Sequence, residues 1–432
     1  MSRLRLLIPL LILAAPGAVA QEIIPCTPGD FLARVEARRG PDGRLRPGSH
    51  FRLAPGHYLL EPAPYREARC GNCEDPATPV DATVGLHLAG DDLRLEGDPR
   101  RPEAVVIHTH AGYGLLWRGV RGGRMRGVTV TDGARDADGN ATCAAVVVED
   151  AELAVEDCVL AGNLGDSALV VEKVVGVMGV AGREGARIAL RRCRILRNSW
   201  DGIALYRGAE ALIEDCLVDG VDKAGGRQLG GGRGVGIGVT WDARATIRRC
   251  RVTRYWKGIG IFVDADVTVT DCVVEELLTW GIACWDASSG RPAARIERNV
   301  VYDTGACGIS LAREAAGAPA PGCCRGNVVA RTGVDPRYDD PERYCLQCPV
   351  AVHALPPDFR LHDNWLFANR RALPAGSPAG PPDLDEATFL AHAEALLHDL
   401  SQHEALAGAR ALRELPRRRV GVLLRADGEE EP

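Results

Sequence analysis

The segment Ala186-Arg-Ile-Ala-Leu-Arg-Arg-Cys193 introduces a pattern of alternating apolar residues, two polar residues and a cysteine. The pattern returns in Ala211-Leu-Ile-Glu-Asp-Cys216, Ala245-Thr-Ile-Arg-Arg-Cys250 and Val267-Thr-Val-Thr-Asp-Cys272. A second short strand follows each cysteine, in Gly202-Ile-Ala-Leu205, Gly236-Ile-Gly-Val239, Gly258-Ile-Gly-Ile261 and Gly281-Ile-Ala-Cys284. The shortest step between two of these cysteines is 22 residues, from Cys250 to Cys272. A recurring period of this length indicates a repeat architecture.

Each repeat contains three apolar runs with period-two alternation, separated by the Gly, Asn and Asp residues that favour turns. Strands this short cannot bury a face in an isolated hairpin, but stacked rungs pair strand to strand and close a common core. The sequence therefore predicts an all-β solenoid, a right-handed parallel β-helix. The equivalent positions, about ten rungs, are Gly97, Gly127, Cys158, Cys193, Cys216, Cys250, Cys272, Asn299, Asn327 and Asn364.

This repeat resembles the pectate-lyase-like superfamily of right-handed parallel β-helices, over roughly residues 45–370. The resemblance implies that the residue at the Asn/Cys position turns inward between the second and third strands and stacks in a ladder. It also implies that the Gly-Ile strand belongs to the first sheet, the usual seat of active sites in that superfamily. Because β-helices host many activities, the resemblance bears on fold much more than on function.

The two ends of the chain predict further segments. Residues 1–20 read as a cleaved signal peptide, with Arg3 and Arg5 before an apolar run and a cleavage site after Ala20, so we expect a periplasmic or secreted protein. An uncleaved anchor is the alternative. Residues 21–50 predict an N-terminal cap with a short helix after Asp30, residues 51–373 the β-helix, and residues 374–416 a linker and an amphipathic capping helix. Residues 417–432 predict a flexible tail, and partner binding is the alternative role for the C-terminal helix.

Charge and apolar patterning limit the partners. The chain has 52 Lys and Arg against 58 Asp and Glu, a formal charge of −6, with both signs mixed throughout. No basic surface for nucleic acid is therefore expected. Beyond the leader, no segment is apolar for long enough to span a membrane. We expect a monomer whose partner is a polysaccharide or an oligosaccharide.

The 15 cysteines divide into two groups. Those at the repeat position predict small buried fillers stacked from rung to rung. The pairs Cys70/Cys73 and Cys345/Cys348 predict disulfides if the chain is exported, with metal binding as the alternative. His108 and His110 lie on one strand face, so metal binding there is retained as an alternative. Residues 136–140 alternate oxygen ligands as calcium loops do, but lack the distant bidentate Glu, so a solvated turn is favoured and Ca²⁺ is the one cofactor left open.

The Gly-Ile strands predict a groove for sugar rings. Their outward residues are small: Ala204, Gly238, Gly260, Ala283 and Ser310. Aromatic residues cluster at both margins of this strip, and such rings suit stacking on sugars. The predicted substrate-binding rings are Trp200, Tyr206, Trp241, Trp256, Phe262, Trp280 and Trp285.

Polar residues near this groove predict a chemistry. β-Elimination from a uronic acid needs a neutralised carboxylate, a base for the C5 proton and a proton for the leaving oxygen. Lyases of the resembled superfamily use Lys or Arg as the base, which favours Lys257 here. The other predicted catalytic residues are Asp201, Arg207 and Arg233, and the polar substrate-binding residues are Asp166, Asp242 and Asp264.

Two functions stay open at this level. The first is an exported β-helix that binds an acidic polysaccharide over the Gly-Ile sheet and cleaves or epimerises it. The second is a non-catalytic periplasmic protein that binds glycan or protein or delivers a metal, and one version resembles the accessory proteins that supply copper to nitrous oxide reductase. The hydrolase, epimerase and calcium motifs of the superfamily are absent from this sequence.

Overall fold

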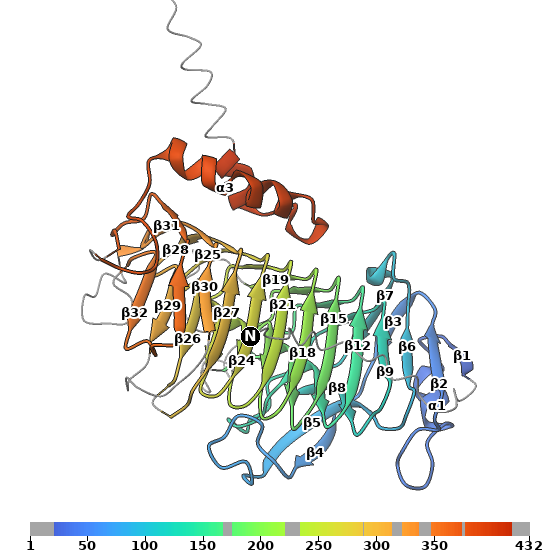
Figure 1. The fold of residues 1–432 in the computed structure, drawn as a ribbon. Helices are drawn as coiled ribbons and strands as arrows, with labels where there is room; N and C mark the ends of the chain where they lie inside the picture. Colours follow the sequence, from blue (N-terminus) through green and yellow to red (C-terminus); the bar gives the residue numbers. More distant parts are fainter. Residues whose placement is uncertain are drawn as a thin grey trace, which may run out of the picture.

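The computed structural model describes residues 21–166, 175–220, 234–287, 289–312, 322–336, 347–373 and 376–416. Its strands wind around one long axis as three sheets, with the rungs side by side from the N-terminal end to the C-terminal end (Figure 1). Neighbouring strands pair in parallel throughout, except for the antiparallel pair β4–β5. The predicted all-β parallel β-helix is confirmed. The leader, Arg233, Cys345 and the tail lie outside the described residues.

Sheet 1 contains the Gly-Ile strands. It comprises β4 (Ala63–Glu67), β5 (Val80–Leu88), β8 (Tyr113–Arg118), β11 (Ala144–Glu149), β14 (Met178–Arg183), β17 (Ile203–Leu205), β20 (Val235–Val239), β23 (Lys257–Phe262), β26 (Ile282–Trp285), β29 (Ile309–Ala312) and β32 (Val350–His353). The residues that point inward from this sheet, such as Ile203, Ile237 and Ile259, are fully buried. Their β-branched side chains fill the space between the sheets.

Sheet 2 contains the strands that lead to the repeated Asn/Cys position. It comprises β1 (Glu22–Cys26), β2 (Ser49–Leu53), β6 (Arg94–Glu96), β9 (Gly123–Arg126), β12 (Glu152–Glu156), β15 (Arg187–Arg191), β18 (Glu210–Glu214), β21 (Arg244–Arg248), β24 (Asp266–Thr270), β27 (Ala293–Glu297), β30 (Gly322–Arg325) and β33 (Phe359–His362).

Sheet 3 contains the strands that follow this position. It comprises β3 (Gly56–Leu59), β7 (Val105–His108), β10 (Thr129–Thr131), β13 (Val159–Ala161), β16 (Arg194–Leu196), β19 (Leu217–Asp219), β22 (Arg251–Thr253), β25 (Val273–Leu277), β28 (Val300–Thr304), β31 (Val328–Thr332) and β34 (Trp365–Phe367).

The predicted ladder between sheets 2 and 3 is present. Its cysteines, from Cys158 to Cys272, are at most 1 % exposed. The asparagines continue it, because the Asn327 side-chain amide donates to Asn364 Oδ1 (2.8 Å) and its own Oδ1 accepts from the backbone N–H of Asn299 (2.9 Å). The Asn299 and Asn327 amides are thus satisfied by the next rung, and the Asn364 amide donates to the carbonyls of Cys324 and Ala379.

Two predicted ladder positions are wrong by one residue. Gly97 and Gly127 align with Asp157, because Glu96 pairs with Arg126 and Arg126 with Glu156. They therefore occupy the turn before the ladder, and Val128 takes the ladder position. Gly127 has the positive φ (65°) that Asp157 also has (54°). The sequence misled here because glycine suits a left-handed turn as readily as a crowded interior position.

The N-terminal cap closes one end of the core. Helix α1 (Phe31–Glu36) buries Phe31 edge-on against Phe51 and Tyr58. The preceding strand β1 pairs in parallel with β2, so the coil begins inside the segment predicted as cap. Asp30 makes no side-chain hydrogen bond to the helix N–H groups. It accepts instead from the backbone N–H of Thr27 (2.7 Å).

The C-terminal helix covers the side of the coil. Helix α3 (Glu386–Ser401) lies across the outer edge of the C-terminal rungs (Figure 1), with its first turn capped by Asp385. Its apolar face, including Phe389 and Leu397, forms one buried cluster with the outward residues of sheet 3, including Tyr302. The described residues also contain the single-turn helices η1 (Pro102–Ala104) and η4 (Glu404–Leu406) and a helical segment at 410–416. No described helix is long and apolar enough to cross a membrane.

The two kinds of ladder residue predict different responses to truncation. Asn327→Ala should lower the free energy of unfolding by about 3 kcal/mol, because it strands buried polar groups on Asn299 and Asn364. Cys250→Ala should cost only about 1 kcal/mol, because it removes a small apolar filler. Chemical denaturation of both variants measures the difference. Equal losses would contradict a polar ladder that depends on its hydrogen bonds.

Candidate functional site

Residues at the amino ends of the sheet 1 strands form a row on the outer side of this sheet, which we call the edge column. It consists of Asp201, Val235, Lys257, Trp280, Cys307 and Cys348. The register of the strands places them side by side, because Ile203 pairs with Ile237, Ile259 with Ile282, and Ile309 with both Ile282 and Val350. Val235 pairs directly with Lys257. The column brings together a carboxylate, an amine, an indole and two thiols.

Lys257 lies inside a cage of four aromatic rings. Its Nζ is 4.5 Å from the ring centroid of Trp256, 4.9 Å from that of Trp285, 5.2 Å from that of Trp280 and 5.5 Å from that of Phe262. The rings also contact one another, with Trp280 and Trp285 edge to face at 5.0 Å. Ring faces attract an ammonium group at these distances. We call these five residues the Lys257 cage.

Asp201 is the buried carboxyl of the edge column. Its Oδ1 accepts a hydrogen bond from the backbone N–H of Val235 (2.6 Å). A Cβ on Gly234 would lie 1.7 Å from Oδ1, so glycine is needed for this close approach. Burial raises the pKa of Asp201 to about 7, against the lowering effects of the Val235 N–H and of Lys257.

The two titratable groups influence each other without forming an ion pair. Burial lowers the pKa of the Lys257 ammonium, and the charge of Asp201 opposes this shift. Among the described residues, Nζ has no hydrogen bond or ion pair, so only the aromatic rings and the field of Asp201 stabilise its charge. Burial thus moves both pKa values towards neutrality, which is the property that acid–base catalysis requires.

The strip of small residues is covered by rings, so the expected open groove floor is wrong. A Cβ on Gly260 would lie 2.3 Å from the Phe262 ring, which therefore lies over this glycine. The Trp285 indole N–H donates to Ser310 Oγ (2.9 Å), and Ser310 is fully buried. The aromatic residues predicted as walls fold inward because glycine and serine leave room beneath them.

A cavity of about 720 Å³ lies beyond the carboxyl ends of the sheet 1 strands. It brings together four predicted residues, Arg207, Trp241, Asp242 and Asp264, with Arg69 and Glu184 also in its lining. The Arg207 guanidinium lies 4.6 Å from the Trp241 ring centroid and donates to the carbonyl of Cys73.

Asp242 and Asp264 also support the turns around this cavity. Asp242 Oδ1 accepts from the N–H of Gly208 (2.7 Å), and Asp264 Oδ1 accepts from the N–H of Arg291 (2.8 Å). A cation over an aromatic ring beside exposed carboxylates makes this a polar recognition site. We call it the Arg207 cavity.

The remaining predicted residues are dispersed. Tyr206 is buried, with its hydroxyl 3.7 Å from the Met178 sulfur, and Trp200 packs against the same apolar cluster. Asp166 is exposed whereas Asp201 is buried, so the two do not form a functional pair. The structure brings Lys257 and Asp201 into one column and Arg207 into the neighbouring cavity.

The predicted metal and disulfide sites have mixed outcomes. In the described part of the chain, no cluster of three or more His, Cys, Asp or Glu residues could hold a metal ion. His108 instead contacts His57 (2.8 Å) and Asp132 (2.5 Å). The Cys70–Cys73 disulfide is confirmed. Cys348 is a thiol, and its motif partner lies outside the described residues.

The calcium-like turn at residues 136–140 is occupied by internal contacts. Asp136 accepts hydrogen bonds from the backbone and hydroxyl of Thr83 (3.0 and 2.7 Å). Asp138 accepts from the backbone N–H groups of Asp81 and Asn140 (3.0 and 2.9 Å). These carboxylates therefore join the turn to the neighbouring strand β5.

A buried charge network was missed by sequence reasoning. Arg183 is fully buried on sheet 1 and lies 2.7 Å from Glu67 and 3.6 Å from Glu149. Burial raises the pKa of Glu149 to about 7, with the neighbouring Glu67 adding to the shift. No local motif reveals this cluster, because its members come from strands far apart in the sequence. Its residues fix the antiparallel strand β4 over the first rungs.

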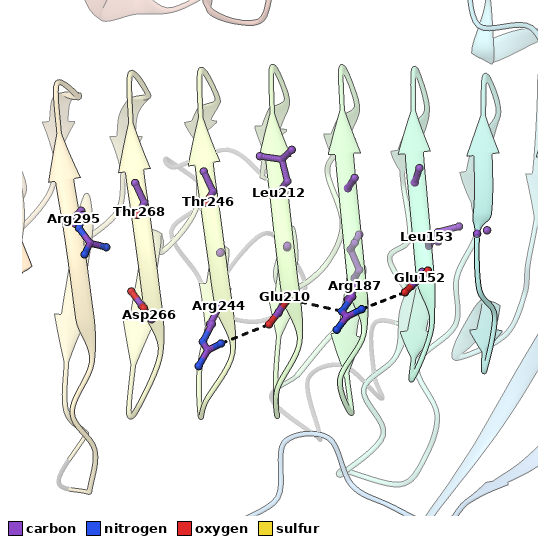
Figure 2. Close-up of a pocket in the computed structure, with 17 residues that line it drawn as sticks. Glu152, Leu153, Arg187, Glu210, Leu212, Arg244, Thr246, Asp266, Thr268 and Arg295 are labelled. Carbon is purple, nitrogen blue, oxygen red and sulfur yellow. Dashed lines mark hydrogen bonds and ion pairs between the residues drawn. The ribbon is translucent and has the colours of Figure 1, made fainter. Parts of the chain in front are cut away.

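The outer face of sheet 2 carries a shallow cavity of about 730 Å³ (Figure 2). Acidic and basic side chains alternate along it, and Arg187 lies between Glu152 (3.3 Å) and Glu210 (3.9 Å). Arg244 also pairs with Glu210 (3.7 Å). Half or more of the Arg187 and Glu210 side chains is exposed, so these contacts contribute little stability. This face is a solvated row of ion pairs and lacks converging functional groups.

One family model and several solved structures are similar to this chain. The family model described as a right handed beta helix region matches residues 185–320. The chain is similar to pectate lyase Pel9A (11 % identity, 80 % of each chain, TM-score 0.40) and to the A-module of the mannuronan C-5 epimerase AlgE6 of Azotobacter vinelandii (11 %, 79 % of this chain and 82 % of that one, 0.34). It is also similar to the Dettilon tailspike protein (12 %, 78 % and 56 %, 0.35). No curated protein matches the chain.

These findings define the class. The chain is a right-handed parallel β-helix. The activities in those names belong to those proteins, and at these identities the function of this chain depends on its own side chains.

The raised pKa of Asp201 predicts a pH-dependent stability. The folded state holds the proton more tightly than the ordinary carboxyl pKa of 3.8 allows, so the stabilising contribution is complete below about pH 4 and is lost as the pH rises through about 7. The free energy of unfolding should fall by up to about 1.4 kcal/mol per pH unit in this window. In Asp201→Asn, which stays neutral, the fall should be shallower.

Urea denaturation at several pH values checks this prediction. Glu149 titrates in the same window in both proteins, so only the difference between wild type and variant reports on Asp201. Identical pH profiles for the two proteins would contradict a protonated, buried Asp201.

Proposed function

We propose that this chain is exported and monomeric, and that it binds an acidic polysaccharide across the Lys257 cage and the Arg207 cavity, where it abstracts the C5 proton of a uronate. Cleavage and epimerisation share this first step. The observation that carries the proposal is the edge column itself. It places a desolvated amine and a protonatable carboxyl on one outer face, with pKa values shifted in the directions that suit a base and an acid.

The proposed reaction assigns one role to each group. Lys257 in its neutral form removes the C5 proton. The Arg207 cavity, beyond the opposite ends of the same strands, binds another part of the polysaccharide through the Arg207 guanidinium and the Trp241 ring. Protonated Asp201 supplies the proton for the leaving oxygen in cleavage. In epimerisation it returns a proton to C5 from the other side. The Lys257 ammonium and the Asp201 carboxylate then exchange a proton with water to restore the starting state.

The aromatic rings suit the same substrate. Trp256, Trp280 and Trp285 are half-buried, so each combines a packed edge with an accessible one. Such rings stack on the apolar faces of sugars and exclude water from the amine. Arg207 is preorganised by the Trp241 ring and by the Cys73 carbonyl, so little side-chain freedom is lost on binding.

Removal of the amine should abolish turnover and leave binding. Lys257→Ala should lower the rate of unsaturated uronate formation, followed by ultraviolet absorbance on a panel of acidic polysaccharides, by at least about 100-fold. Affinity for the same polysaccharide should fall much less, because the Arg207 cavity remains. Arg244→Ala, on the solvated face of sheet 2, is the matched control. An active Lys257→Ala variant would refute the assignment of the base.

The pH dependence of the rate follows from the two proton states. The rate should rise as Lys257 loses its proton and fall as Asp201 loses its own near pH 7, giving a bell-shaped profile. The competent form has a neutral Lys257 and a protonated Asp201. Its population is greatest at a pH between the two pKa values, regardless of which residue has the higher pKa. Asp201→Asn should remove the alkaline limb while lowering the rate. A variant profile that retains this limb would exclude Asp201 as the acid.

A binding or accessory role without turnover is the second candidate. It is favoured by the cage, because four ring faces stabilise the Lys257 ammonium and thereby oppose its action as a base. This function is supported if wild type yields no unsaturated uronate and no epimer on any substrate. Loss of polysaccharide affinity in Trp285→Ala would then identify the cage as a binding site alone.

A further inference from the structure

The C-terminal end of the edge column holds two thiols that the proposed reaction does not use. Cys307 precedes β29 and Cys348 precedes β32, and these strands pair in register through Ile309 and Val350. The N–H of Gly308 donates to the Cys348 carbonyl (3.3 Å), so the two cysteines lie directly opposite each other. They form a small buried cluster against which Trp280 of the Lys257 cage packs.

The geometry permits a covalent bond between them. Neighbouring parallel strands lie about 4.8 Å apart, within the Cα–Cα range of about 4.4–6.8 Å that disulfides span. The Cys307 thiol donates to the Ile309 carbonyl (3.1 Å). The neighbouring Cys307 side chain is the main cause of a lowered pKa for the Cys348 thiol. A bridge could therefore form with little movement of the backbone.

The ladder cysteines are different although they also lie on successive rungs. They are enclosed between sheets 2 and 3, and burial raises the pKa of the Cys193, Cys216 and Cys250 thiols well above the ordinary value. Thiolate is the reactive form, so these thiols are poor nucleophiles. Cys307 and Cys348 are as buried (0 % and 2 % exposed), but they lie on the outer side of sheet 1 and pack against one half-buried indole.

We propose that Cys307 and Cys348 form a dithiol site that reacts with disulfide oxidants, from small molecules to oxidised dithiol proteins, to give a disulfide between the last two rungs of sheet 1. The Cys348 thiolate attacks one sulfur of the oxidant and releases its first thiol. The deprotonated Cys307 then attacks the Cys348 sulfur and releases the second thiol. The two cysteines lose two protons and two electrons, and the oxidant disulfide is reduced to two thiols.

The bond would have a local consequence. It ties β29 to β32 beside Trp280, one wall of the Lys257 cage. This inference does not depend on turnover at Lys257, because it concerns only the thiols and the strands that carry them.

Peptide mapping tests the proposal on the full chain. The folded protein is treated with oxidised glutathione, quenched with acid, alkylated and cleaved with trypsin without reduction. Cys307 falls alone in the peptide 299–313, and Cys348 falls with Cys345 in the peptide 344–360. The expected result is a linked pair of these peptides, with a mass lower than their sum by two hydrogen atoms, in wild type and in Cys345→Ser. The link should be lost in Cys348→Ser.

Other outcomes overturn the proposal. A loop between Cys345 and Cys348 within peptide 344–360, or an alkylated Cys307 after oxidation, would show that the inter-rung bond does not form. Persistence of the link in Cys348→Ser would assign it to Cys345. The ladder thiol in peptide 208–223, Cys216, is the internal control, and it should react only after denaturation. Equal oxidation of Cys216 in the folded protein would contradict the selectivity proposed here.

Discussion

One backbone turn, repeated between sheets 2 and 3, holds the coil together. On successive rungs the residue before the ladder adopts a left-handed conformation with φ between 52° and 65°. These residues are Gly127, Asp157, Arg192, Asp215, Arg249, Asp271, Arg298, Gly326 and Asp363. A non-glycine residue in this conformation is strained by about 1–2 kcal/mol. The strain is accepted because the turn directs the next side chain into the interior and returns the chain to sheet 3 in register.

The side chains at this turn position also stabilise the turn. Aspartate and arginine alternate at the position, and each pair bridges two rungs: Asp157 with Arg192 (2.7 Å), Asp215 with Arg249 (2.7 Å) and Asp271 with Arg298 (2.8 Å). A single ion pair of this kind contributes little to the free energy of unfolding at a surface. Here the three pairs stabilise one column of stacked turns. Because the rungs stack in register, the residues at any one position of the repeat form a row along the coil. The ladder and the edge column are two rows of one register.

The repeat explains why much of the fold was predictable from the sequence. The spacing located the repeat positions from Cys158 onwards, and the resemblance to the pectate-lyase-like superfamily implied that they stack in a ladder. The error at Gly97 and Gly127 came from a residue type that fits two adjacent positions. The contact between Arg183 and Glu67 was invisible because no period relates the first rungs to the antiparallel strand β4. Helix α3 was recognisable as amphipathic, but its docking on the side of sheet 3 depends on outward apolar residues such as Tyr302.

The side-chain arrangement of the candidate site was less predictable from the sequence than the fold. The sequence placed Lys257 among aromatic residues, but the cage requires the rings of Phe262 and Trp285 to fold over Gly260 and Ser310, a choice of side-chain rotamer that no spacing encodes. It also could not reveal that Val235 separates Lys257 from Asp201. That separation matters physically. A direct ion pair would hold the amine charged and the carboxyl ionised, whereas with a full rung between them burial dominates and both pKa values move towards neutrality. An amine and a carboxyl kept apart in this way can exchange protons with a substrate lying between them, which a closed ion pair cannot do.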